Sequence, residues 1–253
     1  MKLKIMTYNI ASGRTFDHIQ SAEEASGKLP YDLHKCADVI ASIAPDICGM
    51  NEVDNYMSRS GRVSQTEQIG EHTGMKGFFG KAISFDFDAD GAYGNAVLSR
   101  FPILEAETIP IPDPERKDEH AYYETRAVTR VKLDVNGTVV TVLQTHFGLA
   151  IAEHQNAQVT LLKLLDQTEG PVILMGDFNI RPSDFLLNPI RERLQDTAVL
   201  ADGYFKTFPS YPCNYPDCKI DYVFVSNHFK PLRLEIPQTS ASDHLPYVVE
   251  VEL

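Results

Sequence analysis

Polar side chains stand at the ends of several apolar, strand-like segments of this 253-residue sequence. They occur at seven points along the chain, namely at Asn9, Glu52, Asn95, His146, Asp177 with Asn179, Asp221, and Asp243 with His244. Because strand ends can meet along one edge of a sheet, we expect these groups to converge on a single cleft. Buried carboxylates are unfavourable unless a cation or a hydrogen-bond donor compensates them, so the cluster predicts a bound cation.

The residue types at these points indicate the chemistry of the cleft. Carboxylate and amide oxygens without sulfur ligands suit a hard divalent cation such as Mg²⁺ or Mn²⁺. Mg²⁺ commonly takes one or two protein carboxylates and leaves its other positions to water and substrate phosphate. Two histidines beside such a metal could transfer protons at neutral pH. The residues alone therefore predict metal-assisted hydrolysis, with phosphorus as the favoured reacting centre.

Each of these residues also has a purely structural interpretation. A lone Asn at a strand end is usually a turn former, and Asp177-Phe178-Asn179 is compatible with an Asx turn. Glu52 could lie in a solvated loop, His146 could be a hydrogen-bonded residue at a sheet edge, and Asp243-His244 could cap the segment that follows. The occurrence of all seven points in one chain favours the functional interpretation.

Strands and helices that could position these groups alternate along the whole sequence. Apolar residues three and four apart predict a helix at 31–44, which Pro45 ends. Strict alternation predicts a strand at 122–135, and Asn136-Gly137 predicts a hairpin turn into a strand at 138–147. We expect further strands at 2–10, 46–53, 76–85, 94–100, 171–178, 220–226, 232–236 and 247–253, and further helices at 64–73 and 151–167. Glu52 would end the second of these strands, and Asn95 would open the strand at 94–100.

The mixture of hairpin-linked strands and helices indicates an α+β fold. Two sheets packed face to face, with helices outside, would shelter the apolar faces of so many strands. The segment 171–178 is almost wholly apolar, so we expect it to be buried on both faces. No repeat, linker or low-complexity tract divides the sequence, so residues 1–253 are expected to form a single domain.

Composition and charge restrict the partners. The chain has 23 Lys and Arg against 35 Asp and Glu, a net charge of −12, and never more than two basic residues in a row. This balance disfavours broad nucleic-acid binding, although it leaves a local basic patch open. No apolar run approaches the ~20 residues of a membrane span. No signal-peptide core follows Met1, so we expect a cytoplasmic protein unless an export signal has been removed. The sequence indicates no protein partner.

Four cysteines complete the inventory of reactive groups. Cys36 and Cys48 lie among apolar residues and are expected in the core. Cys213 and Cys218 bracket a short loop and could form half of a zinc site, a disulfide or neither. No His pair lies near them, so an ordinary reduced loop is favoured.

Seven short motifs carry a resemblance to a known family. In order they are Thr7-Tyr8-Asn9-Ile10, Asn51-Glu52-Val53, residues 94–100, Thr145-His146, residues 176–179, Ile220-Asp221-Tyr222 and Ser242-Asp243-His244. With these motifs, residues 9–244 resemble the endonuclease/exonuclease/phosphatase superfamily. That group includes pancreatic-type deoxyribonucleases, abasic-site endonucleases, neutral sphingomyelinases and inositol-polyphosphate 5-phosphatases. The resemblance implies a four-layer α/β/β/α sandwich of two mixed sheets. Asn51 is a departure, because the family often has Gln there.

The resemblance also implies a metal site and a water-activating pair. Glu52 would be the principal metal carboxylate, with Asn9 nearby and Asp243 contributing to the same Mg²⁺ or Mn²⁺ site. Asp177 and Asn179 would orient or deprotonate the attacking water and hold a phosphate oxygen.

Two histidines receive roles from the same resemblance. His244, oriented by Asp221, would bind phosphate or act as an acid or base. His146 stands where some members have Tyr, a position that is often assigned to the leaving group. The role of general base stays divided between Asp177 and His244.

Asn95, Arg126 and Asn179 are the candidates for substrate binding. Arg126 could instead lie on the solvent face of its strand. Arg59 and Arg62 could bind an anionic substrate group or lie in a solvated loop.

The expected function is hydrolysis of an anionic phosphoester with the help of a divalent metal. A phosphodiesterase acting on a small soluble phosphoester or a phospholipid headgroup is favoured, and a nuclease acting on DNA or RNA is the alternative. A binding module that had lost catalysis would have replaced Glu52, Asp177, Asp243 or His244, and all four are present.

Overall fold

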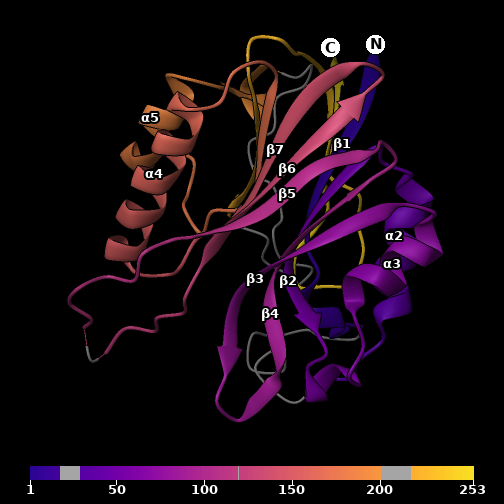
Figure 1. Cartoon of the computed structure of the whole chain (residues 1–253), viewed down its shortest axis with the longest axis vertical. Coiled ribbons are helices and arrows are strands. Elements are labelled where there is room, and N and C mark those ends of the chain that lie inside the picture. Colours follow the sequence, from indigo (N-terminus) through magenta and orange to yellow (C-terminus); the bar gives the residue numbers. More distant parts are fainter. Residues whose placement is uncertain (18–28, 119, 201–217) are drawn as a thin grey trace.

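Two mixed six-stranded sheets form the centre of the fold (Figure 1). The computed structural model describes residues 1–17, 29–118, 120–200 and 218–253. The first sheet, in the order β11-β12-β1-β2-β4-β3, contains β1 (Lys2–Asn9), β2 (Ile47–Asn55), β3 (Lys76–Phe85), β4 (Asp88–Ser99), β11 (Lys230–Glu235) and β12 (Tyr247–Glu252). The second, in the order β5-β6-β7-β8-β10-β9, contains β5 (Ile103–Pro110), β6 (Ala127–Val135), β7 (Thr138–His146), β8 (Val172–Asp177), β9 (Gln195–Asp196) and β10 (Asp221–Val225).

Helices cover the outer face of each sheet (Figure 1). The first sheet carries α2 (Leu33–Ile43) and α3 (Gln65–Thr73), and the second carries α4 (Ile151–Asp166) and α5 (Asn188–Arg191). The short helix α6 (Thr197–Leu200) precedes β10, and 3₁₀ turns occupy Ala11–Gly13, Ser58–Ser60 and Phe185–Leu187. The layers therefore run helix, sheet, sheet, helix, which confirms the predicted α+β sandwich. Among the described residues, no helix has the length and apolarity needed to cross a membrane.

Local sequence explains how α2 begins and ends. The Asp32 side chain accepts a hydrogen bond from the backbone N–H of His34 at 3.2 Å, which caps the first turn. Ala44 takes a left-handed conformation with φ of 51°, and Pro45 follows it, so the helix cannot continue. Its buried stripe includes Cys36 and packs in the same apolar cluster as Cys48, which confirms both cysteines as core residues.

The two sheets pack through their inner apolar faces. Ile5 and Ile47 from the first sheet share one buried cluster with Val131 and Ile173 from the second. Every residue of β8 is buried, as the apolar run predicted. This packing fixes the separation of the sheets, and the strand ends that carry the polar groups are fixed with it.

Several element boundaries differ from the sequence predictions. β6 begins at Ala127 rather than at 122. Residues 122–126 lie outside its pairing with β5 and β7. β4 begins at Asp88, six residues earlier than predicted, so Asn95 lies inside the strand rather than at its start. β5 was not predicted. It is an edge strand with no fully buried residue, so it lacks a clear apolar alternation.

Gly176 allows β7 and β8 to approach each other just before the polar strand ends. Its φ is 142°, and a Cβ at this position would overlap the backbone oxygen of Thr145, its pairing partner on β7. Gly170 also has a positive φ, 83°, but the nearest atom to its Cβ position, the Val139 oxygen, is 4.0 Å away.

We therefore expect Gly176→Ala to lower the free energy of unfolding by about 2–4 kcal/mol, because it adds a backbone clash to conformational strain. Gly170→Ala should lose roughly 1 kcal/mol from strain alone. Urea unfolding of both variants at 25 °C tests this. Equal losses would show that the close approach at Gly176 contributes nothing.

Candidate active site

The polar residues predicted at strand ends converge at the junction of the two sheets. Asn9 is the last residue of β1, and His146 and Asp177 are the paired last residues of the parallel strands β7 and β8. Asp221 is the first residue of β10 and pairs with Asp177 from the other side. Parallel and antiparallel pairing thus bring these side chains to one edge.

Glu52 reaches this edge through a β-bulge rather than at a strand end. β2 continues to Asn55, and its pairing with β4 shifts between Met50 and Val53. Glu52 has φ of 57° within this bulge. The extra residue re-aims the side chains on either side of it. The expectation that Glu52 ends its strand is therefore wrong, because the bulge turns its side chain without ending β2.

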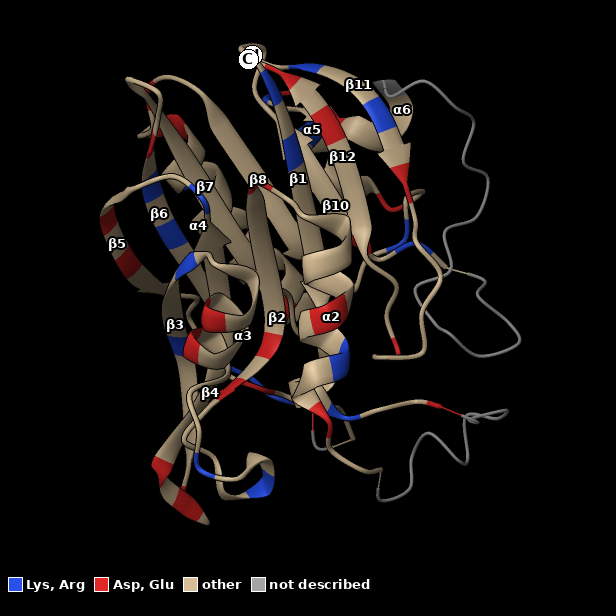
Figure 2. Cartoon of the chain, turned by 90° about the vertical axis from the view of Figure 1, so that its right-hand side faces the viewer, with Lys and Arg blue, Asp and Glu red and all other residues tan. Residues whose placement is uncertain are grey.

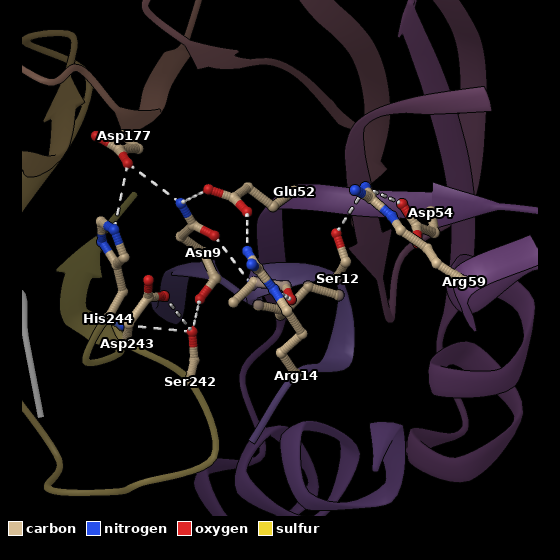
Figure 3. A network of polar contacts seen from close by, with 12 residues as sticks. Asn9, Ser12, Arg14, Glu52, Asp54, Arg59, Asp177, Ser242, Asp243 and His244 are labelled. Carbon is tan, nitrogen blue, oxygen red and sulfur yellow. Dashed lines mark hydrogen bonds and ion pairs between the residues drawn. The ribbon is translucent and has the colours of Figure 1, made fainter. Parts of the chain in front are cut away.

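Asn9 links the two carboxylates of the junction (Figure 3). Its Nδ2 donates to Glu52 Oε1 at 3.1 Å and to Asp177 Oδ2 at 3.2 Å. Its Oδ1 accepts from the backbone N–H of Ala11 at 3.0 Å, which fixes the orientation of the amide. The other oxygen of Glu52 faces Arg14 Nη2 at 3.4 Å, so both oxygens of this carboxylate have donors.

Ser242 fixes the loop that carries Asp243 and His244. This loop leads into β12, which begins three residues after His244. Its buried hydroxyl donates to the backbone oxygen of Asn9 at 2.7 Å and accepts from the backbone N–H of His244 at 3.3 Å. Asp243 and His244 therefore lie beside the end of β1 (Figure 3).

The two histidines approach the same oxygen of Asp177. Nε2 of His244 lies 3.5 Å and Nε2 of His146 lies 3.6 Å from Asp177 Oδ2. His244 Nδ1 also pairs with Asp221 Oδ2 at 2.9 Å. Asp177 Oδ1 accepts from the backbone N–H of Asn179 at 2.9 Å, the Asx turn that the sequence allowed. Asn179 Nδ2 donates to the backbone oxygen of Phe147 at 3.0 Å.

The surroundings give these groups different charges. Burial would lower the pKa of His244, but Asp221 and Asp177 raise it well above its usual value. Burial lowers the pKa of His146 well below its usual value, and the positive charges of Arg126 and His244 lower it further. Burial raises the pKa of Asp177 to about 7. These shifts favour the charged form of His244 and the neutral form of His146.

Arg126 lies against His146, and only 8% of its surface is exposed. Its Nη1 donates to Glu124 Oε1 at 2.6 Å and faces His146 Nδ1 at 3.1 Å. Because Arg126 can only donate, His146 Nδ1 is the acceptor, and the ring proton is on Nε2. Tyr93 also lies close enough to Arg126 to interact with its charge. The interpretation of Arg126 as a solvent-facing residue is therefore wrong.

Glu52 and Asp243 are candidate ligands for a divalent cation. Burial raises the pKa of Asp243, and although His244 opposes the shift, the charge of Glu52 raises it further. The two carboxylates thus lie close enough to repel each other, and a cation between them would relieve that repulsion. A second set of possible ligands consists of Asp177, Asp221 and His244, whose ligand atoms lie within 4.8 Å of one another. The 2.9 Å pair of His244 with Asp221 already compensates charge in that set.

Three other candidates are engaged by partners of their own. Asn95 is buried between the sheets, where Oδ1 accepts from Asn51 and Nδ2 donates to the backbone oxygen of Ala127. Arg59 is held by Asp54, which is wholly buried, through contacts of 2.9 and 2.7 Å. Arg62 similarly pairs with buried Asp88 at 2.6 Å. Cys213 lies outside the described residues, so the prediction for Cys213 and Cys218 stays a prediction.

Sequence reasoning missed Arg14 and Tyr93. Arg14 follows a strand end and a 3₁₀ turn, and nothing in its neighbours indicates a partner at position 52. Tyr93 lies in the part of β4 that was not predicted, and its ring stacks under the Arg59 guanidinium at 5.3 Å. For the other residues of the site, the signal in the sequence was the order of the seven motifs.

Comparison with known proteins agrees with this arrangement. The sequence matches the Endonuclease/Exonuclease/phosphatase family over residues 6–244. The uncharacterized protein YbhP of Escherichia coli (strain K12) is 25% identical over 170 residues, covering 65% of this chain and 64% of YbhP. The match therefore spans less than two thirds of that relative's length.

Solved structures show the same fold. An endonuclease/exonuclease/phosphatase from Beutenbergia cavernae DSM 12333 has a TM-score of 0.77 at 25% identity, covering 100% of this chain and 72% of that one. A mannosyl-6-phosphatase of Bacteroides thetaiotaomicron VPI-5482 has a TM-score of 0.69 at 20% identity, covering 99% and 100%. A humanized TDP2 of D. rerio has a TM-score of 0.66 at 14% identity, covering 100% and 99%. From the family match over nearly its whole length, together with this shared fold, the chain belongs to the endonuclease/exonuclease/phosphatase family, whose members hydrolyse phosphoesters.

Proposed function

We propose that residues 1–253 form a single catalytic domain that hydrolyses a small phosphoester, with a phosphodiester or phospholipid headgroup as the favoured substrate, using Mg²⁺ or Mn²⁺. The observation that carries this proposal is the convergence on Asp177 Oδ2. One carboxylate oxygen lies within 3.6 Å of Asn9 Nδ2, His146 Nε2 and His244 Nε2, and Asn9 links it to Glu52.

Glu52 and Asp243 would hold the metal, and Asn9 would keep Glu52 in place. When bound, the metal would neutralise charge on the phosphate and on the attacking oxygen. Arg14 offsets part of the negative charge of Glu52 at Oε2, the oxygen that Asn9 does not contact. This assignment agrees with the repulsion between Glu52 and Asp243, which leaves a need for positive charge.

Asp177 would accept the proton of the attacking water. Its pKa of about 7 suits a general base that works near neutral pH. His244 is already protonated, so it suits binding of a phosphate oxygen rather than proton abstraction. Asp221 would keep this imidazolium oriented through the 2.9 Å contact with Nδ1. Asn179 would hold a further phosphate oxygen beside Asp177.

His146 and Arg126 would act on the side of the leaving group. The neutral ring of His146 carries its proton on Nε2, so it can donate a hydrogen bond to the leaving oxygen. Arg126 supplies a buried positive charge next to this ring. Both would stabilise negative charge as the bond to the leaving group breaks.

A small substrate is favoured over nucleic acid by charge. The net charge of −12 repels a polyphosphate backbone, and acidic and basic segments are interspersed on the face seen in Figure 2. The mannosyl-6-phosphatase of similar fold acts, by its name, on a small phosphoester.

A substrate panel tests this proposal. Bis-p-nitrophenyl phosphate, a p-nitrophenyl monoester, sphingomyelin, inositol polyphosphates and plasmid DNA would be compared with and without Mg²⁺. We expect Mg²⁺-dependent turnover of small esters. Preferential cleavage of plasmid DNA would favour the nuclease instead.

Glu52→Gln should lower metal-stimulated turnover about 10²-fold or more, because it removes a charged ligand without changing size. Its melting temperature should stay close to that of the wild type, whereas its thermal stabilisation by Mn²⁺ should fall. Exposed Glu67→Gln on α3 is the matched control and should change neither property. Turnover of Glu52→Gln within about threefold of wild type at limiting Mg²⁺ would refute the metal assignment.

The two histidines should differ in their dependence on the leaving group. His244→Ala should lose about 10²–10³ in kcat/KM on every substrate, because it removes a charged hydrogen-bond donor at the phosphate. His146→Ala should lose far less on p-nitrophenyl esters than on alkyl esters, because a leaving group of low pKa needs little assistance. The measurement is kcat/KM across a series of leaving groups, with His72→Ala as control. A constant loss for His146→Ala would make it a positioning residue.

The pH dependence of kcat/KM should follow the ionisation of Asp177. A base with a pKa of about 7 is protonated in acid, so kcat/KM should fall as the pH drops below about 7 at limiting Mg²⁺. Saturating Mg²⁺ adds positive charge near Asp177, which favours the carboxylate and should move this limb to lower pH. Profiles at two Mg²⁺ concentrations test the assignment. A limb that moves to higher pH with Mg²⁺ would contradict it.

A further inference from the structure

A chain of buried side-chain amides crosses between the two sheets next to the active site. It consists of Asn95 on β4, Asn51 on β2 and Gln144 on β7, each at most 1% exposed. At one end, Asn95 Nδ2 donates to the backbone oxygen of Ala127 at 3.0 Å. In the middle, Asn51 accepts from the backbone N–H of Asp177 at 2.9 Å, and Gln144 forms the other end.

Asn51 uses both its donors and both its acceptor positions in this chain. Nδ2 donates to Asn95 Oδ1 and to the backbone oxygen of Thr145, both at 2.8 Å. Oδ1 accepts from Gln144 Nε2 and from the backbone N–H of Asp177, both at 2.9 Å. An Asn side chain has two N–H donors and two acceptor positions, so its hydrogen-bonding capacity is filled.

The neighbours allow Asn51 only one orientation of its amide. Asn95 must accept from Asn51, because its own Nδ2 is committed to Ala127. Gln144 donates to Asn51 from the opposite side. With the Asn51 amide reversed, its NH₂ group would face two donors, Gln144 Nε2 and the backbone N–H of Asp177. The backbone oxygen of Thr145 and the backbone N–H of Asp177 set this orientation, and Gln144 supplies the second donor to Asn51 Oδ1.

Gly49 makes room for this arrangement. It lies two residues before Asn51, and a Cβ at position 49 would overlap the side-chain oxygen of Gln144. The space over Gly49 is thus filled by the Gln144 amide group. The short Asn51 side chain and the long Gln144 side chain meet because position 49 has no side chain.

Each attachment of the amide chain lies at or beside a residue of the proposed active site. Asn51 precedes Glu52, Thr145 precedes His146, and Asp177 is held directly. Ala127, at the far end, follows Arg126. The chain thus ties together four strands or loops that supply catalytic groups.

We propose that Asn51, Gln144 and Asn95 are positioning residues, which fix the Asp177 carboxylate relative to Glu52 across the interface of the sheets. This inference rests on the proposed function, because it concerns the geometry of the reaction. A displacement of about 1 Å in a reacting group can cost 10²-fold in rate. The amide chain limits such displacements between strands that share no hydrogen bonds with each other, namely β2 and β8.

Gln144→Leu tests the proposal, because it keeps side-chain volume and removes one of the two donors to Asn51 Oδ1. We expect kcat on the preferred small ester to fall about tenfold with KM within about twofold, measured well below the melting temperature. Mn²⁺ affinity, measured by calorimetry, should stay within about twofold, because Glu52 keeps its contacts with Asn9 and Arg14.

Thr129→Val is the matched control. Thr129 is buried between the same sheets, and its hydroxyl has no hydrogen-bond partner among the described residues. The substitution removes a hydroxyl group between the sheets and leaves the amide chain intact, so kcat should be unchanged. A fall in kcat as large as that of Gln144→Leu would show that interlayer packing alone explains the effect. Loss of stability in Gln144→Leu with unchanged kcat would also overturn the proposal.

Amide hydrogen exchange at Asp177 separates this inference from the proposed function. Gln144→Leu should lower the protection of the Asp177 N–H, whether or not any substrate is turned over. Inactivity of the wild-type protein on every substrate would refute the function, and unchanged protection at Asp177 would refute the positioning role. Should Gln144→Leu fail to fold, Asn95→Leu breaks the chain at its other end, and the same two readouts apply.

Discussion

Negative charge buried between two sheets is the constraint on which this structure depends. Asp177 is 1% exposed, with Asp221 paired beside it and Glu52 linked to it through Asn9. Such a cluster is stable only where donors and cations surround it. The protein supplies the imidazolium of His244, the amide of Asn9 and the backbone N–H of Asn179. Glu52 and Asp243 still repel each other despite these donors, and a metal held by both would relieve that repulsion.

The fold meets this constraint by joining strands from both sheets at one edge. A bulge in β2 turns Glu52 toward the junction, and a buried serine holds Asp243 and His244 against β1. Between the sheets, apolar packing gives way near the site to the amide chain of Asn51. The same interface therefore carries the apolar core and positions the residues of the candidate site.

The sequence predicts the layers well because alternation and helical spacing are local properties. It predicts the positions of Asn9, His146, Asp177 and Asp221 because strand ends converge. The bulge at Glu52 could not be predicted, since it depends on pairing between β2 and β4. Arg126 was ambiguous because alternation alone cannot distinguish an exposed side chain from one buried against His146. Asn51 and Gln144 are 93 residues apart, so no local pattern joins them.

The position of Mn²⁺ in crystals, located from its anomalous scattering, is the most direct test of the central claim. Two sets of ligands are available, and they imply different chemistry for Asp177. We expect Mn²⁺ to be bound by Glu52 and Asp243, which leaves Asp177 and His244 to act on water and phosphate. Mn²⁺ bound only by Asp177, Asp221 and His244, with none at Glu52, would contradict the assignment of both the metal and the base.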